Sequence, residues 1–250
     1  MAEQNNLIVY CEYEDGKVAD VSLELLTKGR SLATQLGVKL QAIVAGDKLE
    51  GIEAQLFPYG VDTVYKVEDA RLYPYTSLPH SSILINLFKE IKPQIAFMGA
   101  TSIGRDLGPR VSSCLHSGLT ADCTRLDIKV SNYIEYNKAN TTLNTDTLDP
   151  NDPDTGIKQT RPAFGGNLMA TIICPKTRPQ MSTVRPGVMQ KQERVEGATG
   201  EIVRVTPEIA AEDIRIQIKD IVKSAKEMVS LTDADIICSG GRGLGDASGF

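Results

Sequence analysis

The sequence contains no tryptophan, only two histidines and five scattered cysteines among its 250 residues. No two cysteines have Cys-x-x-Cys spacing, so neither a disulfide framework nor a zinc or iron–sulfur site is indicated, and we expect no bound metal. We expect Cys11, Cys114, Cys123, Cys174 and Cys238 to be reduced thiols inside the fold. With 5% aromatic residues, the chain also lacks the stacking platforms of proteins that bind single-stranded nucleic acids.

A basic stripe and a long apolar run are missing as well. The net charge of −5 is spread over the chain, which argues against a nucleic-acid partner. No apolar run approaches the roughly 20 residues that span a bilayer, and the polar residues 2–6 lead into a strand-like run rather than a signal peptide. We therefore expect a cytoplasmic protein without membrane insertion.

The first half of the chain repeats one pattern, in which an apolar run, a turn and an amphipathic stretch lead to another apolar run. This order is typical of βαβ units, which build parallel sheets. We expect strands at residues 7–13, 39–45, 63–67 and 94–99, and helices at 21–36, 52–57 and 81–91. Gly37 can end the first of these helices. The sequence therefore predicts an α/β fold with an open, doubly wound parallel sheet.

The loop that follows Gly99 is a candidate site, because ligands of doubly wound sheets lie beyond the carboxyl ends of the strands. Its residues 100–110 lead into a helix. One interpretation is purely structural, with Ser102 capping the helix and with Arg105 and Asp106 in solvent. The other interpretation is a contact with a ligand or a second subunit.

The middle of the chain, residues 136–159, is rich in Asn, Thr, Asp and Pro, and an acidic insertion occupies residues 144–154. This insertion lacks the regular aspartate spacing and the closing glutamate of an EF-hand, so we expect a solvated loop rather than a calcium site. A buried apolar strand is expected at residues 167–174. A basic turn through Arg178 and Arg185 should follow it.

We place the domain boundary in a polar, glycine-bearing stretch, giving domains at residues 1–200 and 201–250. Beyond it, apolar and polar residues alternate from Ile214, which indicates a half-buried strand or the start of a helix through Met228. Residues 235–238 are expected to form a buried strand that leads into the glycine-rich loop SGGRGLG at residues 239–245.

Such a loop lets backbone N–H groups approach an anionic or planar ligand without interference from Cβ atoms. Its spacing is neither the Gly-x-Gly-x-x-Gly of dinucleotide-binding folds nor that of a Walker loop. Arg242 is a permanent cation between glycines and requires an anionic or π-rich partner when buried. A second candidate is RPAFGGN at residues 161–167, for which the structural alternative is a tight turn with Arg161 on the surface.

Five ordered blocks carry a resemblance to a known family. They are residues 104–110 (GRDLGPR), 118–123 (GLTADC), 161–172 (RPAFGGNLMATI), 177–187 (TRPQMSTVRPG) and 239–244 (SGGRGL). With the N-terminal pattern, they resemble the alpha subunit of electron-transfer flavoproteins over almost the whole chain. The resemblance implies a Rossmann-like, adenine-nucleotide-hydrolase-like N-terminal domain that packs on a homologous beta subunit, followed by the start of a second α/β domain that binds FAD.

The resemblance also implies which residues contact the cofactor. The loop that would hold the isoalloxazine ring of FAD consists of Ser239, Gly240, Gly241, Arg242, Gly243 and Leu244. Subunits of this family continue well beyond that loop, so we expect the FAD domain to be truncated here. In family members that bifurcate electrons, Arg161, Phe164 and Gly165 would face a second flavin in the beta subunit, and the Arg161 loop favours that type.

The implied function is electron transfer through FAD between an NADH-linked or dehydrogenase donor and a partner flavoenzyme such as acyl-CoA dehydrogenase, with ferredoxin as acceptor in the bifurcating type. A structural subunit that supports a nucleotide-binding beta subunit without binding FAD is the alternative. A nicotinamide dehydrogenase is disfavoured, because no Gly-x-Gly-x-x-Gly turn follows the first strand. A stand-alone nucleotide-binding module leaves the loops of Arg161, Arg178 and Arg242 unexplained.

Overall fold

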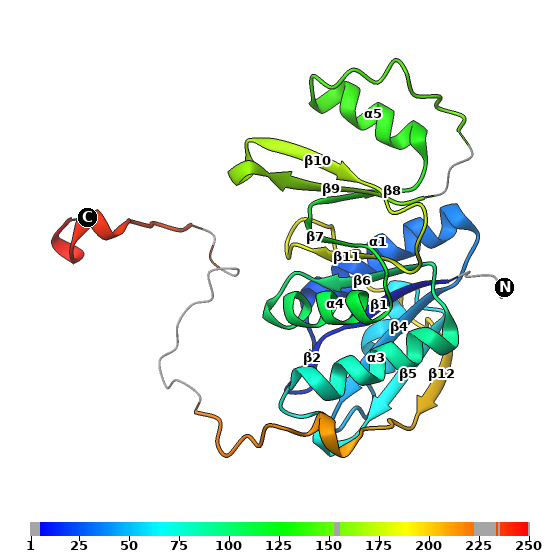
Figure 1. Ribbon diagram of the computed structural model, residues 1–250, viewed down its shortest axis with the longest axis vertical. Coiled ribbons are helices and arrows are strands. Elements are labelled where there is room, and N and C mark those ends of the chain that lie inside the picture. The colour runs from blue at the N-terminus through cyan, green and yellow to red at the C-terminus, as the bar shows by residue number, and fades with distance from the viewer. Residues whose placement is uncertain (1–5, 153–155, 223–233, 235, 250) are drawn as a thin grey trace. The chain divides into compact units, whose positions relative to one another are not determined.

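The computed structural model describes residues 6–152, 156–222, 234 and 236–249. The chain divides into two compact units, one ending at Ile216 and the other beginning at Gln217. The first unit contains a seven-stranded sheet and a three-stranded sheet (Figure 1). In the part of the chain that the structure describes, no helix is long and apolar enough to cross a membrane.

All strands of the larger sheet are parallel. Their spatial order is β12 (Glu201–Val205), β5 (Thr63–Glu68), β4 (Leu40–Gly46), β1 (Leu7–Cys11), β6 (Ile95–Gly99), β11 (Gln180–Val184) and β7 (Leu119–Cys123). The chain begins at β1, proceeds through β4 to β5, and then returns to β6 on the other side of β1. This reversal makes the sheet doubly wound and confirms the predicted fold class.

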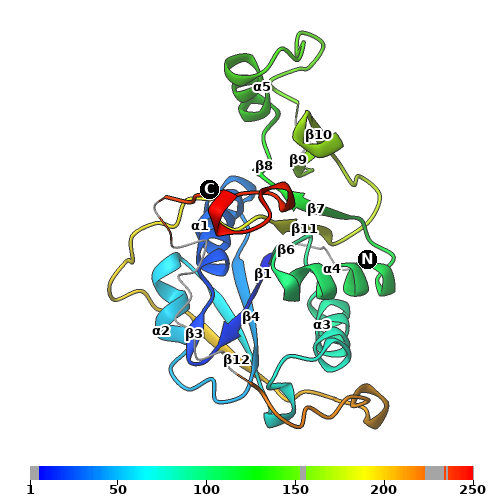
Figure 2. The same ribbon diagram turned by 90° about the vertical axis from the view of Figure 1, so that its left-hand side faces the viewer.

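Helices cover both faces of this sheet (Figures 1 and 2). One face packs against α1 (Asp20–Leu36) and α2 (Glu53–Leu56), and the other against α3 (Ser77–Ile91) and α4 (Ser102–Cys114). Along β1, Leu7, Val9 and Cys11 point toward α1, whereas Ile8 and Tyr10 belong to the cluster beneath α3 and α4. Because both faces are covered, every residue of β1 is buried.

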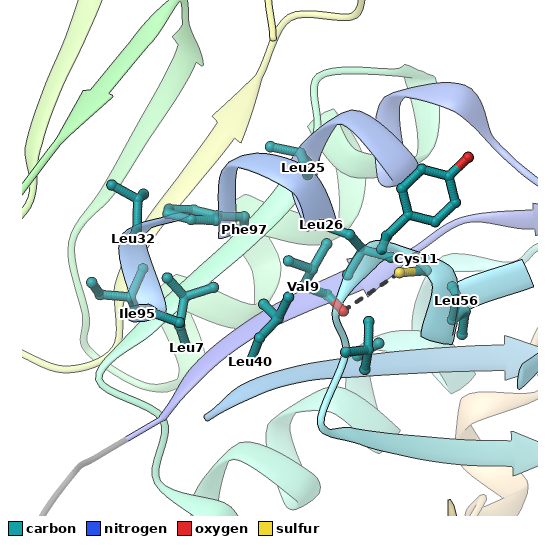
Figure 3. Packing of buried hydrophobic residues seen from close by; sticks show 14 of the residues in the cluster. Leu7, Val9, Cys11, Leu25, Leu26, Leu32, Leu40, Leu56, Ile95 and Phe97 are labelled. Carbon is teal, nitrogen blue, oxygen red and sulfur yellow. Dashed lines mark hydrogen bonds between the residues drawn. The ribbon is translucent and has the colours of Figure 1, made fainter. Parts of the chain in front are cut away.

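The helix α1 packs closely on the sheet (Figure 3). Its Leu32 lies in the same fully buried cluster as Phe97 of β6. Gly29 permits this close approach, because a Cβ atom there would lie 2.9 Å from Cδ1 of Leu40. Gly37 ends the helix with a φ of 69°, in the left-handed region that glycine adopts without strain. The predicted cap is therefore confirmed.

A three-stranded antiparallel sheet with one helix packed on it forms a second part of the first unit, here called the arm. The arm consists of β8 (Arg125–Asp127), α5 (Val130–Asn140), β9 (Lys158–Ala163) and β10 (Leu168–Ile172). The Arg125 guanidinium lies 3.7 Å from the centroid of the Tyr136 ring, and the Tyr133 hydroxyl donates to Thr171 Oγ1 at 3.2 Å. These contacts hold α5 on one face of the arm.

Two expectations for the middle of the chain are wrong. Residues 136–140 belong to α5 rather than to a loop, because contacts with the arm stabilise a helix whose own sequence is polar. The apolar strand expected at residues 167–174 is the shorter β10, and it is not buried, since nothing in the described chain covers its outer face. Residues 144–152 lie mostly at the surface.

The basic turn expected through Arg178 and Arg185 contains a buried strand. All five residues of β11 are buried between β6 and β7, because pairing on both sides gives this short polar run a place in the sheet. A second difference concerns the boundary that we place after residue 200. Residues 201–205 form β12, which pairs with β5, so the first unit extends to Ile216.

Several shorter expectations also need adjustment. The first strand ends at Cys11, and residues 13–18 form the small hairpin of β2 (Tyr13–Glu14) and β3 (Lys17–Val18). Cys11 and Cys123 are buried as expected, whereas Cys174 is half-buried and Cys114 and Cys238 are exposed.

The second unit lacks the strand expected at residues 235–238 in the part that is described. Ile236 is 84% exposed and Ile237 is 55% exposed, and Asp235 lies outside the described residues. A strand needs a neighbour to satisfy its backbone N–H and C=O groups, and the described residues of this unit provide none. The alternation that begins at Ile214 forms neither strand nor helix as far as residue 222, and Met228 is outside the described chain.

Candidate functional site

The segment RPAFGGN forms the end of the β9–β10 hairpin. Ala163 pairs with Leu168 across the hairpin, and a tight turn at Phe164–Gly166 closes it. Phe164, Gly165 and Gly166 have φ values of 48°, 66° and 92°. Glycine adopts such angles readily, but phenylalanine does so at a cost. The turn predicted for this segment is present, and it fixes the Phe164 backbone in an unusual conformation.

The hairpin exposes large apolar side chains. Phe164 is 81% exposed, Leu168 57%, Met169 52% and Ile173 55%. Single exposed apolar residues are normal on a protein surface, but several at the end of one hairpin favour an interaction site. Because strand residues alternate, Leu168 lies on the face of Ala170, and Met169 lies on the face of Thr171, so the exposed residues surround the hairpin end. We call Phe164, Leu168, Met169 and Ile173 the hairpin patch.

Arg161 lies on the face of the arm that points away from α5. The Thr160 and Thr171 hydroxyls pair at 2.9 Å on the α5 side, and strand residues alternate, so Arg161 lies on the opposite face. Burial raises the pKa of the Cys123 thiol to about 12, and the positive charge of Arg161 acts in the opposite direction. The Arg161 side chain is half-buried, and the Thr124 N–H donates to the carbonyl of the adjacent Thr160 at 2.9 Å, which places this part of β9 beside the carboxyl end of β7.

A group of charged residues gathers at the carboxyl ends of β7 and β11. Asp122 lies 3.1 Å from a guanidinium nitrogen of Arg105 and 3.9 Å from one of Arg185. Asp122 has a φ of 59°, and a hydrogen bond from its backbone N–H to the Thr183 hydroxyl at 3.0 Å fixes its position. Two guanidinium groups share one carboxylate, so this edge carries excess positive charge.

Sequence reasoning missed this group, although the signal was present in the resemblance blocks. Arg105, Asp122 and Arg185 come from three different blocks, and the block of Arg161 reaches the same edge through its proximity to Cys123. Arg105 is exposed, as the structural interpretation expected, and its guanidinium also forms an ion pair with Asp122. Four of the five blocks converge in space, which local sequence cannot reveal.

The predicted cap of α4 also needs correction. Thr101, not Ser102, is the N-cap residue, and its Oγ1 accepts from the Gly104 N–H at 3.1 Å. Asp106 accepts hydrogen bonds from Tyr75 at 2.8 Å and from Ser77, and these bonds together with Arg110 hold the pKa of the carboxyl below its usual value despite partial burial. Asp106 is thus a structural anchor for the segment that precedes α3, and it is not simply solvated.

The glycine-rich loop lies in the second unit. Its Arg242–Leu244 segment is a 3-10 turn, in which the Leu244 N–H donates to the Gly241 carbonyl at 3.0 Å. A Cβ atom at Gly241, Gly243 or Gly245 would meet nothing within 4 Å. The Arg242 guanidinium has no hydrogen-bond or ion-pair partner among the described residues, and the loop is exposed.

The loop offers several hydrogen-bond donors to an anionic or planar ligand. The Ser239 hydroxyl, the backbone N–H groups and the Arg242 cation can all donate to ring oxygens and nitrogens, and the open glycine faces leave room for a planar group. Within the described residues, no group of three or more His, Cys, Asp or Glu side chains is placed to hold a metal ion.

Fold and site together define a doubly wound parallel α/β protein with an antiparallel arm and an arginine-rich carboxyl edge. Residues 7–210 match the electron transfer flavoprotein domain, and the chain belongs to this family, several of whose members are named as electron transfer subunits. Membership confirms the resemblance seen in the five blocks.

The relatives come from several bacteria. The acryloyl-CoA reductase electron transfer subunit beta of Anaerotignum propionicum is 43% identical over 94% of this chain and 65% of its own length. The electron transfer flavoprotein subunit alpha of Thermoanaerobacterium thermosaccharolyticum is 42% identical over 100% of this chain and 69% of its own length. A lactate dehydrogenase (NAD(+),ferredoxin) subunit of Acetobacterium woodii is 33% identical over 95% of this chain. The chain spans about two thirds of the length of the first two relatives.

Proposed function

We propose that the chain is the alpha-type subunit of a two-subunit electron transfer flavoprotein and that it contributes to binding FAD. The observation that carries this proposal is the open glycine-rich loop, whose Arg242 has no partner among the described residues, in a chain that belongs to the electron transfer flavoprotein family. Bound FAD would supply the electron-accepting and electron-donating chemistry. The residues of this chain would bind the ring, orient it and set the charge around it.

The proposed role of Arg242 is to adjust the reduction potential of the bound flavin. A fixed guanidinium next to the ring attracts the negative charge that the flavin gains on reduction, more than it attracts the neutral oxidised ring. Such a preference raises the reduction potential. Gly241 and Gly243 flank Arg242 and allow the backbone to approach the ring, because a Cβ atom is absent there.

The hairpin patch is the proposed contact with a beta subunit. Its exposed apolar side chains suit a surface that becomes buried on association, and the half-buried Arg161 would stand at the edge of that surface. We propose that Arg161, Phe164 and Gly165 face a second flavin held by the beta subunit, as in electron-bifurcating members of the family. NADH, ferredoxin and an acyl-CoA dehydrogenase are the proposed exchange partners. The name of one relative includes NAD(+) and ferredoxin, and that of another includes acryloyl-CoA reductase.

The decisive experiment is a count of nucleotides in the purified two-subunit complex. Two FAD molecules per complex are the expected result for the bifurcating type. One FAD together with AMP would refute the second flavin and leave the FAD site of the alpha subunit intact. A complex without flavin absorbance would refute the proposed function and favour a structural subunit.

A matched pair of variants tests whether Arg161 contributes to the number of flavins that the complex retains. Arg161→Ala is expected to weaken retention of the flavin in the beta subunit, whereas Arg215→Ala, an exposed arginine whose Nε donates only to the Glu212 carbonyl at 2.9 Å, should leave both flavins bound. Equal flavin content in the two variants would contradict a role for Arg161.

A further inference from the structure

A small cavity lies at the switch point of the main sheet. The chain reverses its direction of winding between β1 and β6, and the carboxyl ends of these strands form the place where doubly wound folds hold their ligands. A cavity of about 70 Å³ opens here, lined in part by Tyr10, Glu12, Tyr13 and Tyr75. We call it the Glu12 cavity. It is far smaller than the pockets that hold whole nucleotides, typically about 300 Å³ or more.

In nucleotide-binding folds, the helix N-terminus at the switch point binds an anion. In this protein, other atoms of the chain occupy that place. The N-terminus of α4 points its free N–H groups at this edge, where a phosphate would usually lie. Here Thr101 caps the helix, and its hydroxyl donates to Glu12 Oε1 at 2.7 Å. A Cβ atom at Gly104 would lie 1.8 Å from the Gly99 carbonyl oxygen, so the helix start is packed against the strand end. The Glu12 carboxylate thus stands near the helix end where an anion would bind.

Glu12 is a buried carboxylate without a cation. The residue is only 6% exposed, and its second carboxylate oxygen has no hydrogen-bond or ion-pair partner among the described residues. Burial raises the pKa of Glu12, and the other charge that acts on it is the carboxylate of Glu14, which raises the pKa further. Buried carboxylates are normally paired with a cation, because they lose their hydration on burial.

A second buried polar group lines the same cavity. Tyr10 is 3% exposed, and its hydroxyl has no hydrogen-bond partner among the described residues. Two polar groups, each more than nine-tenths buried and each lining one cavity, therefore have unused hydrogen-bonding capacity. A ligand with several N–H donors would satisfy both of them.

Four further lining residues match a positive charge, and the rest of the lining is His80, Tyr73 and small or apolar residues. Tyr13 and Tyr75 add aromatic rings, whose faces attract cations, and Glu14 and Asp47 place two more carboxylates on the lining. The ring of Tyr13 is held by its hydroxyl, which donates to the Lys48 carbonyl at 2.8 Å. A metal ion is a poor match, because among the described residues no three acidic, His or Cys side chains converge on one point.

We propose that the Glu12 cavity binds an organic cation, an ammonium or guanidinium group, which forms an ion pair with Glu12 and lies against the tyrosine rings. The group is small enough to enter the cavity at the end of a flexible alkyl stem. Its source is either a lysine or arginine side chain of a partner subunit or a small free amine. The position that binds anionic phosphates in related folds has thereby become a cation site.

The test uses the whole chain and two simple probes, n-butylammonium and n-propylguanidinium, with n-butanol as the neutral control. Titration is followed by NMR of ring-labelled tyrosine. Saturable shifts of Tyr10 with the cations, and none with butanol, are expected. The absence of saturable binding, or equal binding of butanol, would overturn the proposal.

Variants assign the binding to the carboxylate. Glu12→Gln keeps an oxygen that can accept from Thr101, and it should bind the cations at least about tenfold more weakly, because an ion pair with a buried charge is lost. Glu50→Gln, at an exposed glutamate, is the matched control and should bind like wild type. The cations should raise the thermal midpoint of wild type and not that of Glu12→Gln. Unchanged affinity in Glu12→Gln would refute the proposal.

The same titration in the two-subunit complex distinguishes the two sources. If a partner side chain occupies the cavity, the probes bind the isolated chain but no longer bind the complex. If the ligand is a free amine, they bind both. Either result supports a cation site, and neither depends on the flavin content of the complex.

Discussion

The strands β1 and β10 are alike in sequence and opposite in environment. Both have five residues and a mainly apolar composition, LIVYC in β1 and LMATI in β10. Every residue of β1 is buried, whereas Leu168 and Met169 of β10 are more than half exposed. The difference lies in coverage, since helices cover both faces around β1, whereas no described element covers the face of the arm that holds Leu168, and on the other face α5 leaves Met169 more than half exposed. Apolar sequence in the main sheet thus stabilises the fold, and apolar sequence in the arm remains available for a partner.

The sharpest test of this comparison replaces one phenylalanine in each region. Phe97→Ala removes a fully buried ring from β6 and should lower the free energy of unfolding by about 3–5 kcal/mol. Phe164→Ala removes a ring that is 81% exposed and should change it by less than about 0.5 kcal/mol. Urea denaturation of both variants measures the difference. Similar losses in the two variants would contradict the contrast between sheet and arm.

The same Phe164→Ala variant should affect the affinity for the beta subunit more than it affects the free energy of unfolding. If the hairpin patch contacts a beta subunit, the loss of this ring should weaken the complex by about 1–3 kcal/mol, because a central aromatic side chain contributes strongly to an interface. Isothermal titration calorimetry with the beta subunit provides the measurement. Leu143→Ala, at a residue that is 51% exposed in the polar loop, is the control. A wild-type affinity for Phe164→Ala would assign the contact to another surface.

A smaller effect is expected at the glycine-rich loop. Arg242→Ala should lower the one-electron reduction potential of the bound flavin, by about 60 mV for each 1.4 kcal/mol of lost preference for the one-electron-reduced state. Arg242→Lys keeps the charge and should restore part of the potential. Spectroelectrochemical titration of the complex measures both. The proposed role of Arg242 fails if the potential is the same in wild type and Arg242→Ala.

The smallest effect concerns pH and the two histidines. Burial lowers the pKa of His80, whose Nδ1 lies 2.9 Å from the Thr76 carbonyl. As pH falls below about 6.5, the unfolded chain takes up the proton first, so stability decreases by at most about 1.4 kcal/mol per pH unit until the folded pKa is passed. His80→Gln should flatten this decrease, and His116→Gln, at an exposed residue, should not. Unfolding curves between about pH 5 and pH 7 test both variants.

Local pattern was sufficient for the first half of the sheet. The strands through residues 7–11, 40–46, 63–68 and 95–99 are apolar runs between clear helix signals, so each is recognisable without knowledge of its neighbours. In contrast, β11 and β12 are short, polar or flanked by proline, and they become strands because β6 and β5 offer free edges. Their pairing partners lie more than 80 residues away in the sequence, so the residues of β11 and β12 alone do not predict these strands.

The candidate site divides in the same way. Residues 161–166 and 239–245 are conspicuous in sequence, because glycine next to arginine or phenylalanine marks a turn that presents a side chain. The joining of Arg105, Asp122 and Arg185 at one edge required the parallel order of β7 and β11. The pairing of Glu12 with Thr101 likewise depends on the adjacency of β1 and β6.

The sequence by itself determined the doubly wound class, the ends of the first helices, the two glycine-bearing loops and, through five ordered blocks, the family. These properties follow from the periodicity of apolar residues and from backbone geometry, which act over short distances. Only the tertiary structure decided which apolar strand is buried, which charges share Asp122, and that Glu12 is buried without a cation among the described residues. Burial and ion pairing depend on what lies across the fold, and a chain read in one dimension does not contain that information.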